Sequence, residues 1–109
     1  MSWKIVFLPE AEKDFKNLEG NARLIVTKSL KKVAENPLPD NEGGYGKPLG
    51  NKNKNNLSGF LKIKIKNIGI RIVYKLIKIE NQMLIVVIGA RKDNEVYDVA
   101  KNRVDKYDI

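Results

Sequence analysis

The stretch "LKIKIKNIGIRIVYKL", residues 61–76, decides the fold because apolar and cationic side chains alternate along it. Leu61, Ile63 and Ile65 fall on one parity. Three lysines share the other parity: Lys62, Lys64 and Lys66. Successive side chains of a strand point to opposite faces of the sheet, so a strand here would carry aliphatic groups on one face and ammonium groups on the other. Like charges along a strand repel each other, so the clustering of lysines on this face calls for an explanation.

The second half of the same stretch predicts a hairpin and fixes the face of an arginine. Ile70, Ile72 and Tyr74 form the apolar parity of the second strand and should share a face with the apolar side of the first. This register requires an even number of loop residues around residues 67–69, with glycine or asparagine supplying a positive φ. Arg71 must then point to the same side as the lysines.

Two helices are predicted before the hairpin. Residues 3–8, "WKIVFL", read as a first strand, and Pro9 is well placed to open a helix that Gly20 ends. Asn21 is predicted to cap a second helix with a buried aliphatic stripe and a solvated lysine face, ended by Asn36-Pro37. Residues 37–56 are dense in Gly, Pro and Asn, which predicts a long loop.

The C-terminal part predicts the remaining sheet and a last helix. Residues 83–91, "MLIVVIGAR", form an almost unbroken apolar run, typical of a central strand buried on both faces. Residues 95–104, "EVYDVAKNRV", then favour a helix. The predicted fold class is α+β, with a mostly antiparallel sheet of four to five strands, two N-terminal helices packed on one face and a short C-terminal helix. The lysine side of the sheet is expected to be the side that the helices leave open.

Composition limits the function classes. The 109 residues are 42% hydrophobic and 31% charged, which predicts one globular domain spanning residues 1–109. Lys plus Arg number 21 against 13 Asp plus Glu, a net charge of +8 that favours a polyanionic partner. With no cysteine and no histidine, the chain has no disulfide, no thiolate nucleophile and no imidazole base, and neither a metal nor a cofactor is expected. Neither a signal peptide nor a membrane span is indicated, so a cytoplasmic location is expected.

The cations of the sheet have two interpretations. Alternation of this kind is typical of any half-exposed antiparallel sheet, and lysine on an outer strand discourages aggregation. The alternative is a phosphate-binding surface made by Lys62, Lys64, Arg71 and Arg91, the last at the end of the apolar run. Arginine forks suit phosphate, and the sequence of this predicted face holds no acid to balance them. These features favour phosphate.

The same residues resemble the RelE toxins of the RelE/ParE toxin–antitoxin superfamily. Three elements carry the resemblance: K-x-K at Lys62 and Lys64, G-x-R-x-V-Y beginning at Gly69, and an arginine six residues before the tyrosine of E-V-Y. The order of "PEAEKDFKNL", "ENP" and "KPLGN…LSGFLKIKI" also fits, so the resemblance spans nearly the whole chain. The sequence departs from the family at Ala90, at Lys92-Asp93 and in the length of its Asn-rich loop.

The resemblance implies a small endoribonuclease that cuts messenger RNA, typically on the ribosome, and a cognate antitoxin protein as partner. It implies a catalytic set at five positions of this chain: Lys62, Lys64, Arg71, Arg91 and Tyr97. Further contacts with RNA are predicted for four cations: Lys47, Lys66, Lys101 and Arg103. No membrane, metal or small-molecule cofactor is implied.

The chemistry is consistent with these residue types. Cleavage through the 2′-hydroxyl of RNA needs a base, a positive clamp on the phosphorane oxygens and an acid for the leaving oxygen. Clustered cations favour the neutral form of a lysine, and Lys64 is predicted to be the base, with Lys62 and Arg71 stabilising transition-state charge. Arg91 would clamp the phosphate, and Tyr97 would stack a base or orient the reaction. For Tyr97 the alternative is a core residue of the last helix.

Two other functions stay open at this point. One is a ParE-like toxin that inhibits DNA gyrase, although that branch generally lacks the full cationic set. The other is a non-catalytic RNA- or protein-binding module, because binding and catalysis need the same cations.

Overall fold

The computed structural model describes residues 2–52, 55–90 and 95–109. Its main sheet has five strands in the order β1-β7-β6-β5-β2. These strands are β1 (Lys4–Phe7), β2 (Lys47–Pro48), β5 (Phe60–Ile65), β6 (Ile70–Ile77) and β7 (Gln82–Ala90). β1 runs parallel to β7, and every other pair in this sheet is antiparallel. A separate two-stranded ribbon pairs β3 (Asn51–Lys52) with β4 (Asn55–Asn56).

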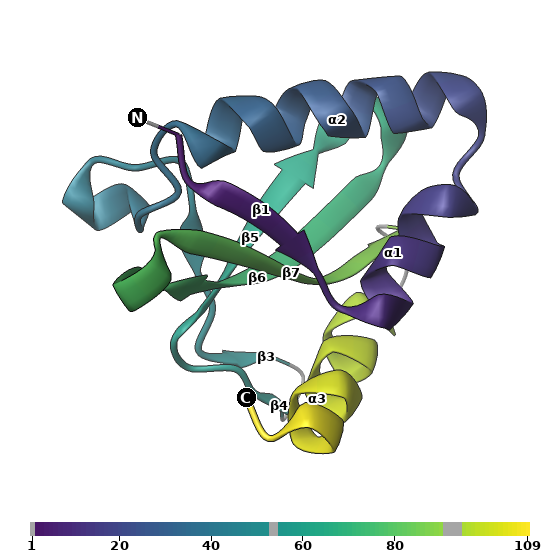
Figure 1. Ribbon diagram of the computed structural model, residues 1–109. Coiled ribbons are helices and arrows are strands. Elements are labelled where there is room, and N and C mark those ends of the chain that lie inside the picture. Colours follow the sequence, from purple (N-terminus) through teal and green to yellow (C-terminus); the bar gives the residue numbers. More distant parts are fainter. Residues whose placement is uncertain (1, 53–54, 91–94) are drawn as a thin grey trace.

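Three α-helices surround the sheet: α1 (Pro9–Lys16), α2 (Gly20–Ala34) and α3 (Glu95–Tyr107). Short 3-10 turns lie at Asp40–Glu42 (η1), Lys66–Ile68 (η2) and Lys78–Glu80 (η3). In Figure 1, α2 runs along one side of the sheet and α3 along the other, with α1 near the end of β1. The α+β class and the mostly antiparallel five-stranded sheet are confirmed.

The predicted hairpin is confirmed in register. Ile65 pairs with Ile70 across the turn, so four residues lie between the strands, and Gly69 supplies the left-handed conformation with φ of 63°. β7 is an inner strand between β1 and β6, and its residues from Met83 to Ile88 are buried. Each fully buried Val, Leu or Ile of this kind contributes about 1.5–3 kcal/mol to folding. The sheet is therefore the centre of the core.

The helix boundaries predicted at the first connection were wrong. α1 begins at Pro9 as expected but ends at Lys16, and Gly20 opens α2 instead of ending α1. The cap of α2 is Glu19, whose carboxylate accepts a hydrogen bond from the Ala22 backbone nitrogen at 2.8 Å. A carboxylate at a helix N-terminus also interacts favourably with the helix dipole, so Glu19 replaces the predicted Asn21.

Residues 37–56 contain more structure than the predicted loop. β2 adds to the sheet beside β5, where Pro48 is tolerated because β2 is the edge strand. The β3–β4 ribbon contacts the last helix, and the Asn55 side-chain amide donates to the Asp98 carboxylate at 2.7 Å. The Gly- and Asn-rich composition hides these short pairings because each spans two residues.

The prediction that the helices leave the lysine side open was also wrong. α3 has 13 residues, so it is not short, and it packs on the face that carries the lysines. Its buried residues are Val96, Tyr97, Ala100 and Val104. The β-carbon that Gly89 lacks would lie 3.3 Å from a methyl carbon of Val96, so the missing side chain lets the helix approach the sheet closely.

Candidate functional site

Cationic side chains from three neighbouring strands share one face of the sheet. Lys64 of β5 lies directly opposite Arg71 of β6, and Lys47 of β2 lies directly opposite Lys62. Side chains of directly paired residues stand on the same face with their β-carbons about 4.5–5.5 Å apart. We call these four residues the cationic face. The register thus confirms that Arg71 points to the lysine side, as the period-two pattern predicted.

Tyr97 of α3 holds two members of this face. Its ring centroid lies 5.4 Å from the Arg71 guanidinium carbon and 5.9 Å from the Lys62 ammonium nitrogen. The same ammonium donates to the Tyr97 hydroxyl at 3.4 Å, a long hydrogen bond. A cation over an aromatic ring is stabilised by about 0.5–2 kcal/mol, more when water is excluded. Tyr97 therefore orients Lys62 and Arg71 from the helix that covers them.

Burial differs along the cationic face. Lys62 is only 8% exposed and Tyr97 only 2%, whereas Lys64 and Arg71 are half-buried and Lys47 is exposed. The sequence predicted a lysine ladder facing solvent, but α3 covers its first member. Tyr97 is a core residue of the helix, which was the alternative, and it also contacts the cations, while its role in stacking a base or orienting the reaction stays a prediction.

The other predicted site residues lie in different surroundings. Lys66 is in the η2 turn and exposed, next to the end of β5. Lys101 forms an ion pair with Asp105 at 2.9 Å on the surface of α3. Arg91 lies outside the described residues, so its predicted role stays a prediction.

Arg103 is engaged at the edge of the sheet. Its guanidinium lies 2.6 Å from the Asp14 carboxylate of α1 and donates to the Val86 carbonyl oxygen at 2.9 Å. Asp14 in turn accepts from the Ile88 backbone nitrogen at 3.1 Å. These contacts tie Arg103 to β7 and α1, and contact with RNA stays a prediction from the sequence.

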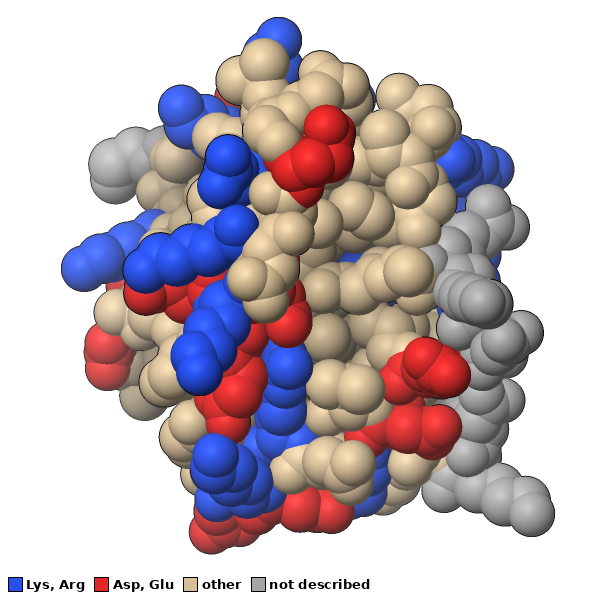
Figure 2. Space-filling model, turned by 90° about the vertical axis from the view of Figure 1, so that its right-hand side faces the viewer, with Lys and Arg blue, Asp and Glu red and all other residues tan. Residues whose placement is uncertain are grey.

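A second ion pair anchors the end of α3 to α1. Glu10 accepts hydrogen bonds from the Lys106 ammonium and the Tyr107 hydroxyl, each at 2.8 Å. These hydrogen bonds, Lys106 first, lower the pKa of Glu10 to about 2. The carboxylate raises the pKa of both Lys106 and Tyr107. On this side of the molecule acidic and basic side chains alternate, as Figure 2 shows.

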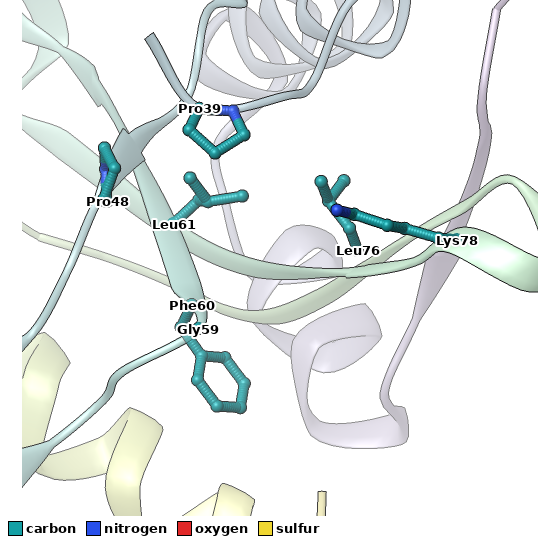
Figure 3. Close-up of a pocket in the computed structure, with 7 residues that line it drawn as sticks. All are labelled: Pro39, Pro48, Gly59, Phe60, Leu61, Leu76 and Lys78. Atoms are coloured by element: carbon teal, nitrogen blue, oxygen red, sulfur yellow. The ribbon is translucent and has the colours of Figure 1, made fainter. Parts of the chain in front are cut away.

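A pocket of about 220 Å³ lies at the other end of the β5–β6 pair, and its lining offers few reactive side chains. Figure 3 shows Pro39, Leu61 and Leu76 around it, with Lys78 at its side and the Phe60 ring turned away. Of the described residues that line it, Lys78 alone is charged. An apolar lining with a single cation gives no reactive arrangement there.

The described residues also limit the alternatives. No group of three or more metal-binding side chains occurs within residues 2–52, 55–90 and 95–109. Across those same ranges, no helix is long and apolar enough to cross a membrane.

The sequence did not reveal two contacts, because the residues that make them are far apart in the sequence and meet only in the folded structure. Gly89 sits opposite Arg71 on β7, and its missing side chain seats α3 over the cations. Tyr45 and Lys32 come together from separate segments, with the Lys32 ammonium 5.4 Å from the Tyr45 ring centroid. The one local signal was the G-Y-G sequence, an aromatic residue between two glycines.

In fold, the chain is similar to the small α+β toxins of the RelE type. A RelE-like toxin protein of Escherichia coli is 25% identical to the chain over 104 residues, covering 95% of this chain and 99% of that protein. An arginine double mutant of the E. coli toxin RelE in the free state superposes with a TM-score of 0.68 at 26% identity, covering 95% of this chain and 99% of that one.

A further structure, the same RelE mutant in complex with a peptide of the antitoxin RelB, gives a TM-score of 0.67 at 25% identity over 92% of this chain and 95% of that one. No family model matches the sequence. The resemblance to RelE toxins is nevertheless confirmed by these comparisons, since the chain is similar to RelE toxins in sequence and in fold.

Proposed function

We propose that this chain is the toxin of a type II toxin–antitoxin pair and that it cleaves messenger RNA on the ribosome. The observation that carries the proposal is the pairing of Lys64 with Arg71 beside Lys62, with Tyr97 in contact with two of these cations. A solvation surface does not require such an arrangement, whereas the phosphorane of RNA cleavage does. The likeness to E. coli RelE supports the same activity.

Each residue of the set has a role that fits its position. Lys64, half-buried beside Arg71, takes the proton of the 2′-hydroxyl, because a neighbouring cation favours a neutral lysine. Arg71 and Lys62 stabilise the charge that develops on the phosphorane oxygens. Tyr97 positions these two groups, since its buried ring leaves little surface for stacking a base.

Arg91 completes the set on the strength of the sequence alone. It stands six residues before Tyr97, at the place where the resemblance puts a phosphate-clamping arginine. We propose that it binds the scissile phosphate. The Arg91→Ala variant should lose about a hundredfold or more in cleavage rate, equivalent to about 2–4 kcal/mol of transition-state stabilisation.

The partners follow from the same proposal. A toxin of this type needs an antitoxin, and the E. coli RelE structure with a RelB peptide is a precedent in a similar protein. We propose a small antitoxin with acidic or amphipathic helical segments, which would complement the net charge of +8. The substrate would be ribosome-bound messenger RNA in the cytoplasm, cut without a metal.

Induced expression followed by mapping of RNA 5′ ends tests the proposal. Wild-type protein should arrest growth and produce new 5′ ends within coding sequences. Lys64→Ala should lose about a hundredfold or more in cleavage rate, while Lys66→Ala should lose much less because Lys66 lies in the turn.

Three results would contradict an RNA-cleaving toxin. Growth arrest with trapped gyrase–DNA complexes and intact RNA would indicate a gyrase inhibitor. Equal and modest losses for both lysine variants would indicate a general electrostatic surface. A folded Arg91→Ala variant with wild-type potency would remove the phosphate clamp from the mechanism.

A further inference from the structure

A cleft of about 300 Å³ opens at the outer edge of β5, on the α2 side. β2 pairs with β5 at Leu61 and Lys62, and in the described part of the chain no strand pairs with this edge further along β5. The cleft lies at that uncovered edge and includes Lys64 in its lining. It is therefore continuous with the cationic face through a residue of the proposed catalytic set.

The lining combines cations with an aromatic ring. Lys32 of α2 and Lys66 of the η2 turn join Lys64 around the cleft, and Ser29 and Asn67 add polar groups. Among the residues that the structure describes, no acidic one lines the cleft. Lys32 and Lys66, with the two hydrogen-bonding side chains, fit a ligand that carries phosphate, while Lys64 joins the cleft to the cationic face.

Tyr45 supplies the ring, and the backbone holds it in a fixed place. Its side chain is 48% exposed, although its backbone nitrogen donates to the Asn36 carbonyl at 3.0 Å. Both flanking glycines are required by close approaches: a β-carbon at Gly44 would overlap the Leu38 carbonyl, and one at Gly46 would overlap the Tyr74 hydroxyl. These contacts constrain the backbone of the turn that presents the exposed ring.

The geometry around Tyr45 suits a nucleobase. The Lys32 ammonium lies over one face of the ring, 5.4 Å from its centroid, so a base would stack on the opposite face. Proteins that bind single-stranded nucleic acid combine aromatic rings with backbone-tracking cations in this way.

We propose that this cleft binds the nucleotide adjacent to the scissile phosphate, with its base stacked on Tyr45 and its phosphate near Lys32 and Lys66. The inference rests on the proposed RNA cleavage. This subsite on the α2 side of Lys64 would set where the RNA strand lies relative to Lys64, the proposed general base.

Single-turnover cleavage of messenger RNA on programmed ribosomes tests the subsite, with toxin in excess at varied concentration. Tyr45→Ala and Lys32→Ala should raise the half-saturating toxin concentration about tenfold and leave the maximal rate within about twofold, since one stacked base is worth roughly that factor or more. Tyr45→Phe keeps the ring and should match wild type. Lys28→Ala removes an exposed lysine of α2 outside the cleft and is the matched control.

A crosslinking measurement gives an independent readout. The messenger carries a 2′-O-methyl group at the mapped cut site, which prevents cleavage, and 4-thiouridine at a neighbouring position. Ultraviolet crosslinking should attach that nucleotide to the peptide that contains Tyr45. Thermal unfolding of every variant checks that a loss does not come from misfolding.

The outcomes separate the subsite from the activity. If wild type cleaves RNA and all four variants behave alike, the subsite is overturned while the proposed function stands. If wild type does not cleave RNA, both fail. If Tyr45→Ala leaves cleavage unchanged and weakens binding of the antitoxin, the cleft is a protein-docking site and the nucleotide assignment is overturned.

Discussion

The two edges of the sheet differ in what covers the backbone beyond their short outer strands. β1 covers only the first part of β7, and beyond it the Val86 carbonyl and the Ile88 amide bond to the Arg103 and Asp14 side chains, which are themselves paired at 2.6 Å. An ion pair thus satisfies backbone groups that a strand would otherwise bond. At the opposite edge, β2 covers only the start of β5, and the remainder borders the lysine-lined cleft.

This difference separates stability from proposed function. Where side chains hydrogen-bond the backbone groups of an edge, substituting those side chains should lower the free energy of unfolding. Substitutions at an edge bordered by exposed cations should change the free energy of unfolding little, but they should weaken RNA binding. We call these the closed edge and the open edge, and each prediction below tests one of them.

Removing the closed-edge cation should have the largest effect on stability. Arg103→Ala should lower the free energy of unfolding by about 2–4 kcal/mol, because it leaves the partly buried Asp14 carboxylate and the Val86 carbonyl without this donor. Urea denaturation with linear extrapolation measures it. Lys101→Ala, which removes a surface ion pair of the same helix, should cost at most about 1 kcal/mol.

The same variant also tests the RNA role that the sequence predicted for Arg103. If Arg103 serves the closed edge alone, the folded Arg103→Ala protein should cleave RNA at the wild-type rate. Equal stability losses for Arg103→Ala and Lys101→Ala would contradict the account of the closed edge.

A smaller loss is expected at the turn that carries Tyr45. Tyr74 is fully buried, its hydroxyl donates to the Pro37 carbonyl at 2.8 Å, and burial raises its pKa. Tyr74→Phe should lower the free energy of unfolding by about 1–2 kcal/mol, because a buried acceptor loses its donor. It should also weaken RNA binding through the displaced Tyr45 turn, whereas Tyr45→Phe should change neither quantity.

Acid should weaken the anchoring of α3 to α1 near the closed edge. The pKa of Glu10 in the folded protein is about 2, against an ordinary value of 4.5, because the carboxylate accepts from Lys106 and Tyr107. A lowered pKa gives stability that is complete above pH 4.5 and is lost as the pH falls toward 2. Melting temperatures of wild type and Glu10→Gln should therefore converge over that range, and a constant gap down to pH 2 would contradict this.

The smallest effect on stability is expected at Lys28, the control position for the variants of the open edge. Lys28→Ala should change the free energy of unfolding by no more than about 0.5 kcal/mol, since Lys28 is exposed on α2 and lines no described cleft. A clear loss in chemical denaturation would show that the surface of α2 contributes to stability and would weaken its use as a control.

The sequence predicted the features that depend on a simple period. Alternation along residues 61–76 placed Arg71 beside Lys64 because strand register moves in steps of two. It could not place α3, because a helix that buries Val96 and Tyr97 could pack on either face of the sheet. Gly89 decides that packing, and its role appears only when β7 is paired with β6.

Side-chain caps were equally hidden from the sequence. Glu19 and Asn21 are both able to begin a helix, and only the structure reveals that the Glu19 carboxylate accepts from the Ala22 backbone nitrogen. The burial of Lys62 was also unpredictable from the sequence, since it follows from the position of Tyr97 on a helix 35 residues away. The pattern fixed which residues share a face, but not what covers it.

The missing side chain of Gly89 sets the height of the helix over the cations. An alanine there would bring a methyl group to 3.3 Å from Val96, tighter than most carbon contacts, so α3 would have to rise by a few tenths of an ångström. Tyr97 follows Val96 on the same turn, and its ring contacts both Lys62 and Arg71. The contact of that ring with the two charges therefore depends on an absent carbon atom on a strand that carries neither of them.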